Sequence, residues 1–467
     1  MVKTPIQILL DAIQDECKEL ASSKIPNEVN QKSYENLLAY LIVRNKIPEE
    51  IDFINIKAVY YSLLQLINNH GDYSEGPYYK PPLNPDEAED IHQYNKENLF
   101  GTSKTEFPIM VTLDKGMLKN RSLFRELIKA GMNVARINCA HDDPAIWEEF
   151  VSEVRLGSTE INKNCLIYMD LAGPKIRLSG FGSEKESIKS GDVLRLFKQE
   201  DRFEQRTAFF KYVSAVVNHP KALHNVRLND SVFIDEGKIG GRVIALGSGY
   251  VDIEITSNYR KKYVLKEGQG INFPDSLVFL NIPAVTKKDN EDLHFIAKHA
   301  DMVGVSFVHQ ARDLRSVREN LSVLTKREIP IVAKIETKDA VYRLPSIIKE
   351  GLSLPSFGIM IARGDLALEV GFEQMAVVQE EILNLAHAAH IPVIWATQIL
   401  ESLTKIGRPT RAEISDVYLG SRAQCMMLNK GKYIKDSVLC LERILSLVQE
   451  YKKTRYEFQK RNDIFFI

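Results

Sequence analysis

Three short apolar stretches of the sequence each end in polar residues that could carry out chemistry. Lys334 and Glu336 close the first stretch, Asp365 follows the second, and Thr397 follows the third. Continuous apolar runs of this length, bounded by Gly and Pro, are typical of strands buried on both faces, as in parallel sheets. Their spacing of about 30 residues is that of one strand–helix unit. Polar residues at the carboxyl ends of consecutive parallel strands meet at one mouth, so the pattern predicts an active site.

The two carboxylates, Glu336 and Asp365, indicate a divalent metal. Such a pair at a barrel mouth suits a hard cation, Mg²⁺ (or Mn²⁺), which keeps open positions for water and substrate oxygens. Lys334 lies two residues before Glu336 and therefore points to the same face of its strand. An ammonium group beside a metal suits a substrate whose negative charge moves during reaction, such as a phosphate or an enolate. A pair of salt-bridged rim carboxylates is the alternative.

Gly364 and Thr397 extend this candidate site. Gly364 precedes Asp365 in a turn, where glycine allows close backbone approach and amide groups at a following helix start could bind a carboxylate or phosphate. Thr397 could relay a proton through water. A buried threonine bonded only to the backbone is the alternative.

A second group of polar residues follows two earlier strands. Arg136 and Asn138 share one face of the second predicted strand, and His141 comes just after it. Asp170 ends the third strand, and Arg177 lies seven residues further along. Arg136 and Arg177 are suited to clamp a transferring phosphoryl group. An ordinary salt bridge at the rim is the alternative for each.

The elements that must position these residues predict an α/β fold, a closed (β/α)8 TIM barrel. Eight apolar runs can be counted, and amphipathic helical stretches fit between most of them. The predicted strands are Ile109–Leu113, Asn133–Asn138, Leu166–Asp170, Asp301–Phe307, Ile329–Ile335, Phe357–Ala362, Pro392–Thr397 and Gln424–Leu428.

The interval of about 130 residues between the third and fourth strands is too long for a simple crossover. It contains runs that alternate apolar and polar residues with turn residues between them, which predicts a small inserted antiparallel β-domain that acts as a lid. A passive insertion is the alternative. We therefore expect four parts: a helical domain at 1–100, a barrel at 101–177 and 277–445, a lid at 178–276, and a C-terminal helix at 446–467.

Composition favours an ordinary globular enzyme. The 61 Lys and Arg residues against 62 Asp and Glu give a net charge of -1, which provides no basic signal for nucleic acid. The sequence has no apolar run long enough to span a membrane and no apolar signal-peptide core. Its five cysteines are scattered, as in reduced proteins. We therefore expect a cytoplasmic protein that binds neither membranes nor nucleic acids.

Six ordered motifs resemble the pyruvate kinase family. The resemblance runs from about Ile109 to Leu441, and the motifs include all the candidate residues described above except His141. The motifs are Met-Asn-Val-Ala-Arg-Ile-Asn at 132–138, Met-Asp-Leu-Ala-Gly-Pro-Lys-Ile-Arg at 169–177, Ala-Lys-Ile-Glu at 333–336, Ile-Ala-Arg-Gly-Asp-Leu at 361–366, Ala-Thr-Gln-Ile-Leu-Glu-Ser at 396–402, and Arg-Pro-Thr-Arg-Ala-Glu at 408–413.

The resemblance implies roles for individual residues. Glu336 and Asp365 would match the family's Mg²⁺ ligands, and Lys334 would match the lysine that stabilises the phosphoryl group and the enolate. Thr397 would match the residue linked to protonation of the enolate carbon. Arg136 would match the arginine that contacts the phosphate.

The implied reaction moves a phosphoryl group from phosphoenolpyruvate to ADP and yields pyruvate and ATP under a closing lid. The turn at Gly364 would supply the amides that bind the substrate carboxylate. Arg136, His141 and Arg177 are the residues that we assign to the nucleotide.

The chain departs from the family around the monovalent-cation site. Ala140 stands where the family has serine, and Lys175 stands where potassium-dependent members carry glutamate. This charge reversal resembles potassium-independent members. We therefore predict that K⁺ is not required and that the ammonium group of Lys175 stands in for the ion beside Asn138 and Asp170.

Two turns on the nucleotide side also differ from the family, at residues 112–117 and 429–432. After the barrel the sequence continues with one long helical segment, so we expect neither the family's C-terminal effector domain nor control by sugar phosphates. A homo-oligomer is left open. Two other functions also remain: a metal-dependent lyase or aldolase that uses a pyruvate enolate, and a non-catalytic phosphoenolpyruvate sensor or scaffold that interacts through its N-terminal helices.

Overall fold

The structure is a computed structural model. It describes residues 30, 32–34, 36–37, 85–102, 107–181, 187–198, 212–258, 262–275 and 284–461. Most of the helical domain predicted at 1–100 therefore lies outside the described residues, which include only 30, 32–34, 36–37 and 85–100 of it.

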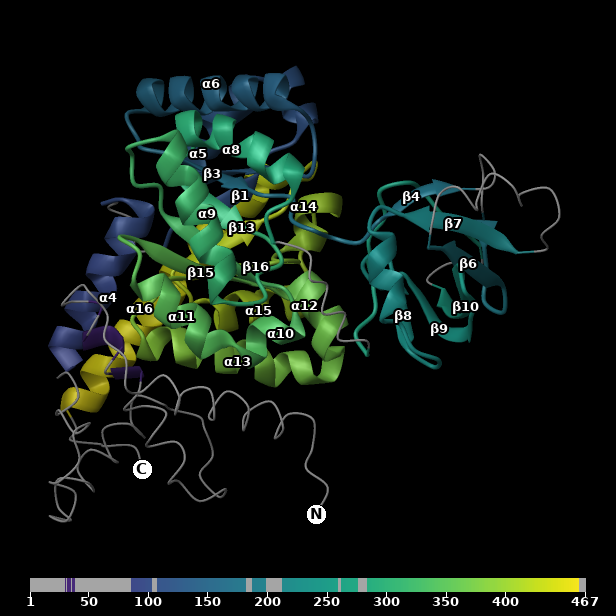
Figure 1. Cartoon of the computed structure of the whole chain (residues 1–467). Coiled ribbons are helices and arrows are strands. Elements are labelled where there is room, and N and C mark those ends of the chain that lie inside the picture. Colours follow the sequence, from purple (N-terminus) through teal and green to yellow (C-terminus); the bar gives the residue numbers. More distant parts are fainter. Residues whose placement is uncertain are drawn as a thin grey trace, which may run out of the picture.

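The eight predicted strands form a closed parallel barrel, which confirms the expected fold class (Figure 1). Parallel neighbours pair in the order β1-β17-β16-β15-β14-β13-β3-β2. The strands are β1 (Ile109–Thr112), β2 (Met132–Asn138), β3 (Leu166–Asp170), β13 (Met302–Val305), β14 (Ile331–Ile335), β15 (Phe357–Ala362), β16 (Val393–Ala396) and β17 (Cys425–Leu428).

Helices surround the barrel and cover the outward faces of its strands (Figure 1). They are α5 (Ser122–Ala130), α6 (Pro144–Ile161), α8 (Lys287–His299), α9 (Ala311–Leu324), α10 (Lys338–Tyr342), α11 (Leu344–Leu352), α12 (Arg363–Val370), α13 (Phe372–Ala388), α14 (Glu401–Ile406), α15 (Arg411–Gly420) and α16 (Ile434–Arg461), with the 3-10 turn η1 (Lys115–Lys119) after β1. α16 runs unbroken across residue 446, where we expected a C-terminal helix to begin. Within the described part of the chain, no helix is both long and apolar enough to cross a membrane.

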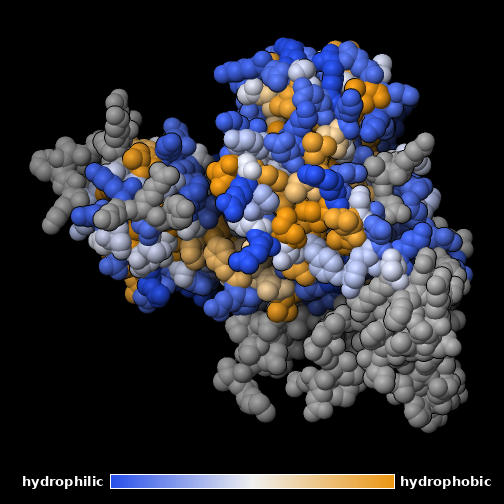
Figure 2. All heavy atoms as spheres, turned by 180° about the vertical axis from the view of Figure 1, so that it is seen from behind, coloured by the Kyte–Doolittle hydropathy of each residue, from blue (hydrophilic) through white to orange (hydrophobic). Residues whose placement is uncertain are grey.

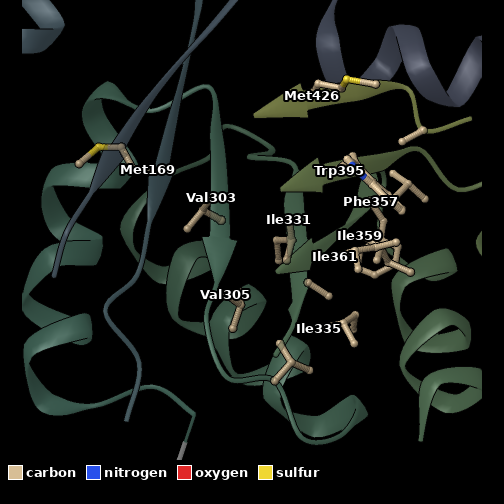
Figure 3. Close-up of a cluster of buried hydrophobic side chains, with 14 of the residues drawn as sticks. Met169, Val303, Val305, Ile331, Ile335, Phe357, Ile359, Ile361, Trp395 and Met426 are labelled. Carbon is tan, nitrogen blue, oxygen red and sulfur yellow. The ribbon is translucent and has the colours of Figure 1, made fainter. Parts of the chain in front are cut away.

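Alternation along the barrel strands separates two sets of side chains. One set, including Ile359 and Ile361, faces the helices and forms the large outer core shown in Figure 3. The other set, including Met360, packs inside the barrel. In β14 the inward column continues from Val332 to Lys334, because side chains two residues apart share a face. The barrel interior therefore changes from apolar to charged toward the carboxyl ends of the strands.

A β-domain is inserted between β3 and α8 and stands to one side of the barrel (Figure 1). Its main sheet has the order β12-β8-β9-β10-β6-β7-β4 and is antiparallel except for the parallel β6–β7 pair. The strands are β4 (Leu178–Phe181), β6 (Val193–Phe197), β7 (Val213–Val217), β8 (Ser231–Ile234), β9 (Ile239–Leu246), β10 (Tyr250–Asn258) and β12 (Ile271–Asn272), with a separate pair, β5 (Ser187–Ile188) and β11 (Tyr263–Val264), and a 3-10 turn, η2 (Pro220–His224).

Helix α4 (Pro85–Phe100) closes the end of the barrel that lies opposite the carboxyl ends of the strands. Leu99 and Phe100 are buried in the interior cluster together with Met110 and Val134 of the first two strands. Burying two such side chains stabilises the fold by about 1.5–3 kcal/mol each. The helix thereby completes an apolar floor beneath the charged mouth.

Histidines packed at the junction of α4 and α13 should make stability depend on pH. His92 packs edge-on against His387, and His390 forms a 3.0 Å hydrogen bond with Ser33. Burial lowers the pKa of His387 to about 3 and that of His390 to about 4, against an ordinary value of 6.5. The unfolded chain therefore binds more protons between these values, and stability should fall as pH decreases from about 6.5, by up to about 1.4 kcal/mol per pH unit for each histidine.

Urea unfolding at pH 7 and pH 5 measures this loss. A His390→Asn variant is the matched comparison, because asparagine tolerates the left-handed backbone (φ +52°) at this position. We expect the variant to lose less stability than the parent between the two pH values. An equal loss in both proteins would contradict the assignment to His390.

Candidate active site

A cavity of about 1150 Å³ lies where the carboxyl ends of the barrel strands face the β-domain. Seen from behind, the β-domain forms a separate lobe, and hydrophobic side chains are exposed in patches on the barrel beside it (Figure 2). Charged groups line the barrel side of the cavity, and the β-domain contributes residues such as Asp235 and Gln269. The predicted site residues that line it are Arg136, Asn138, His141, Lys175, Arg177, Lys334, Glu336, Gly364, Asp365 and Thr397.

Asp170 is the centre of the hydrogen-bond network at the barrel mouth and is fully buried. Its Oδ2 accepts from Arg136 Nη2 at 2.6 Å and from Lys334 Nζ at 3.0 Å, and its Oδ1 accepts from the Tyr168 hydroxyl at 2.8 Å. Burial alone would raise the pKa of Asp170, but the charges of Lys334 and Arg136 lower it below its ordinary value. Asp170 therefore remains ionised and holds both cations in place.

Lys334 links this aspartate to the predicted metal ligands. Its Nζ donates to Ser306 Oγ at 2.7 Å and lies 3.0 Å from Glu336 Oε1. Burial alone would lower the pKa of Lys334, but Asp170 and Glu336 raise it above its ordinary value. The side chain is therefore positively charged at neutral pH and is held by three neighbouring groups.

Glu336 is held from two sides. Its Oε2 accepts from the backbone N–H of Phe307 at 2.7 Å, while Oε1 faces Lys334. Burial raises the pKa of Glu336; Lys334 opposes this, and the nearby charges of Asp365 and Asp170 add to it. A bound cation would relieve the repulsion between Glu336 and these neighbouring carboxylates.

Asp365 lies in the first turn of α12, and its side chain is 18% exposed to the cavity. Lys175, at the start of the β-domain, donates to its Oδ1 at 2.5 Å and lies 5.7 Å from the centre of the Phe307 ring. Asn138 Oδ1 instead accepts from the backbone N–H of Ala140. The structure therefore brings Lys175 to Asp365, the predicted metal ligand, and not to Asn138 and Asp170, where we had expected it.

Thr397 follows β16 directly and has a left-handed backbone, with φ at +76°. The predicted strand, Pro392–Thr397, therefore extends one residue too far at this end. Gly364 lies against it: a Cβ added to Gly364 would be 2.9 Å from Thr397 Cγ2. Glycine is therefore required for the close approach of these two segments.

His141 and Arg177 line the part of the cavity that we predicted to bind the nucleotide. Burial lowers the pKa of His141, and the charges of Lys430 and Arg177 lower it further. Arg177 donates to the carbonyl oxygen of Gly268 in the β-domain at 2.8 Å. This side of the cavity is therefore electropositive, with a neutral histidine among cations.

Several residues of the network were not singled out from the sequence. Thr112 accepts from Arg136 Nη1 at 3.0 Å, and Ser306 binds Lys334. Both are polar residues at the ends of barrel strands, so the rule that identified Glu336 and Asp365 could have found them. Nothing in the sequence pattern marks Tyr168.

The donor set fits one hard divalent cation with an incomplete protein shell. Glu336 and Asp365 supply carboxylate oxygens, the ligands that Mg²⁺ prefers, and both line the cavity. Among the described residues no group of three or more His, Cys, Asp or Glu side chains is arranged to hold a metal. Water and substrate oxygens would therefore complete the shell, as is usual for Mg²⁺ at phosphate sites.

Comparison with known families agrees with this geometry. Residues 107–446 match the model of the pyruvate kinase barrel domain. Pyruvate kinase 1 of Trypanosoma brucei brucei is 34% identical over 327 residues, which cover 68% of this chain and 62% of the relative. A pyruvate kinase of Clostridium perfringens is 30% identical over 299 residues, covering 64% of this chain and 60% of the relative.

The chain thus spans about 60% of the length of these two curated relatives. The family model nevertheless includes the whole barrel, the inserted β-domain and all the site residues named above. The chain therefore belongs to the pyruvate kinase family.

Proposed function

We propose that this protein transfers the phosphoryl group of phosphoenolpyruvate to ADP and forms pyruvate and ATP. The main support is the single network in which Arg136, Lys334 and Glu336 are fixed around the buried Asp170, next to Asp365. Fixed cations beside carboxylates that suit a divalent metal are the groups that stabilise a transferring phosphoryl group.

In this mechanism the protein acts mainly by positioning charge. Glu336 and Asp365 would hold Mg²⁺ (or Mn²⁺), which when bound would neutralise charge on phosphoryl and enolate oxygens. Arg136 and Lys334 face the phosphoryl group as its bond to the enolate oxygen breaks and a bond to the ADP oxygen forms. Because both cations are already held by Asp170, they need no reorganisation during transfer.

The enolate is then protonated at carbon. The backbone amides at Gly364, in the first turn of α12, would bind the substrate carboxylate. Thr397 would pass a proton from water to the enolate carbon, which completes the methyl group of pyruvate. His141 and Arg177 would contact the nucleotide phosphates, and closure of the β-domain would exclude bulk water.

The nucleotide-side turns support a second candidate. Lys430, after β17, lies 3.7 Å from Asp114, after β1, so the two altered turns form an ion pair with each other. A metal-dependent lyase or aldolase would use the same enolate site without ADP. Thermal stabilisation by Mg²⁺ and oxalate, with no further effect of ADP, would favour this alternative over the kinase.

We further propose that activity does not require K⁺. Asp170 already accepts from Arg136, Lys334 and Tyr168, and Asn138 Oδ1 is occupied by a backbone amide. Few carboxylate lone pairs are left for a monovalent ion, while Lys175 supplies a positive charge elsewhere at the mouth, on Asp365.

A discontinuous assay for pyruvate and ATP, with phosphoenolpyruvate, ADP and Mg²⁺, tests both proposals. We expect turnover without K⁺, at equal rates in Na⁺ and K⁺ buffers. Turnover that appears only with K⁺ would contradict the second proposal. Absence of turnover in all salts, with phosphoenolpyruvate still bound, would contradict the first.

A further inference from the structure

The backbone after β16 is strained at the residue proposed to carry the proton. Thr397 and Gln398 both have positive φ, at +76° and +59°. This conformation is uncommon for residues other than glycine and is a clear outlier for a β-branched threonine. Such a backbone is energetically costly and persists only where the surroundings enforce it. Some neighbouring group must therefore hold Thr397.

Arg363 is that group. Its Nε donates to the carbonyl oxygen of Ala396 at 2.9 Å, and its Nη2 donates to the carbonyl oxygen of Thr397 at 2.6 Å. These bonds fix the two peptide units on either side of the Thr397 α-carbon. The direction of the Thr397 Cα–Cβ bond, from which the hydroxyl projects, follows from them.

The guanidinium is itself held on its other sides. Asp416 of α15 receives bonds from both Nη1 and Nη2, the second at 2.7 Å, and the Trp395 ring lies 4.4 Å from the guanidinium carbon. The Arg363 side chain is only 14% exposed. Four of its five N–H groups are thus engaged within the protein, so it is poorly placed to bind a substrate.

We propose that Arg363 is a positioning residue for proton transfer at Thr397. This inference rests on the proposed function, because it needs an enolate that must be protonated. Phosphoryl transfer leaves the enolate of pyruvate; its carbon forms a new C–H bond with a proton that Thr397 passes on from water and ultimately from solvent. Arg363 sets the Thr397 hydroxyl for this step and leaves metal binding and phosphoryl transfer to Lys334 and its network.

The Arg363→Lys variant tests this role. Lysine keeps the charge, but it cannot reach two carbonyl groups and a carboxylate at once in the planar geometry of a guanidinium. The matched control is Arg422→Lys. Like Arg363, Arg422 bonds side chains of another helix, in its case Glu380 and Asn384 of α13, but it does not line the cavity.

Two readouts separate positioning from a general loss of structure. The first is exchange of pyruvate methyl protons with D₂O in the presence of Mg²⁺ and ATP, which NMR monitors. We expect exchange to fall by about 100-fold in Arg363→Lys, because a displacement of about 1 Å can cost that much, while the affinity for Mg²⁺ and oxalate is unchanged. The second is backbone amide exchange of the segment 393–400, which should become faster. Arg422→Lys should change neither.

The outcomes decide the proposal separately from the function. Methyl-proton exchange at the wild-type rate, or unchanged amide exchange at 393–400, would overturn the role of Arg363. If Arg363→Lys does not fold, the test passes to Asp416→Asn, which removes the charged partner of the guanidinium. This variant must show slower methyl-proton exchange and faster amide exchange at 393–400, both in weaker form. If either effect is absent, the role of Arg363 is also overturned. If the wild-type protein exchanges no methyl protons, the proposed function fails, and amide exchange alone decides whether Arg363 holds Thr397.

Discussion

The Lys334→Met variant should lose phosphoryl transfer by about 10³-fold while it retains its fold. Lys334 supplies the buried ammonium group at the mouth, and its contacts to Asp170, Ser306 and Glu336 fix the position of that charge. Removing one preorganised donor to a developing negative charge typically costs about 10²–10³ in rate. Methionine has similar length but no charge, so the loss reports the ammonium group itself.

A cost in stability accompanies this substitution. Asp170 keeps its bonds to Arg136 and Tyr168, but Glu336 loses the charge that lowers its pKa and should be protonated more readily. Breaking a buried ion pair costs about 3–5 kcal/mol when the partner charge is left uncompensated. Because Glu336 can take up a proton, we expect a smaller loss than this.

The measurement is the rate of pyruvate formation together with oxalate binding in the presence of Mg²⁺. Lys435→Met is the matched control, because Lys435 forms a half-exposed ion pair with Glu126 away from the cavity. The control should retain full activity. Activity of Lys334→Met within the range of the control would show that this lysine does not act on the phosphoryl group or the enolate.

The sequence was informative wherever one rule applied to consecutive elements. Apolar runs ending in Lys334, Asp365 and Thr397 predicted both the strands and their shared mouth, because parallel strands of a barrel all end on one side. The inserted β-domain was equally visible from the change to two-residue alternation and the long gap. These features depend on local patterns that repeat along the chain.

Contacts that depend on side-chain direction across the fold were not predictable in this way. Lys175 was expected beside Asp170, but its flexible chain reaches Asp365, 190 residues later. Arg363 appeared only as one position of the motif at 361–366, since its partner Asp416 lies on a helix 53 residues further along. No local pattern encodes either pairing.

The interior of the barrel contains another contact that the sequence pattern does not predict. Gly304 of β13 lies where an added Cβ would be 1.9 Å from the Tyr168 hydroxyl and 2.2 Å from Asp170 Oδ1. The absence of a side chain at Gly304 therefore makes room for the tyrosine that bonds Asp170. A sequence pattern shows a glycine in a strand, but not the large residue on the neighbouring strand that requires it.

Gly304→Ala should accordingly be among the most damaging single substitutions in the barrel. The new methyl group would overlap atoms of two fully buried side chains that are hydrogen-bonded to each other. Overpacking of a core usually costs about 1–3 kcal/mol, and a clash with two fixed polar groups should reach or exceed the upper end. Urea unfolding measures the loss, and displacement of Asp170 should abolish activity through Arg136 and Lys334.

A second substitution distinguishes this clash from a general intolerance of the strand. Gly304→Ala combined with Tyr168→Ala removes the obstructing ring and should recover part of the stability. Gly180→Ala, where an added Cβ would lie 3.1 Å from Val216 Cγ2 in the β-domain, is the control and should cost much less stability.

The double variant also leaves Asp170 Oδ1 without its hydroxyl donor, so any restored activity should rise when K⁺ is added. Equal stability of Gly304→Ala and Gly180→Ala would contradict the packing argument, whereas a restored but K⁺-insensitive activity would show that Tyr168 is not what makes K⁺ dispensable.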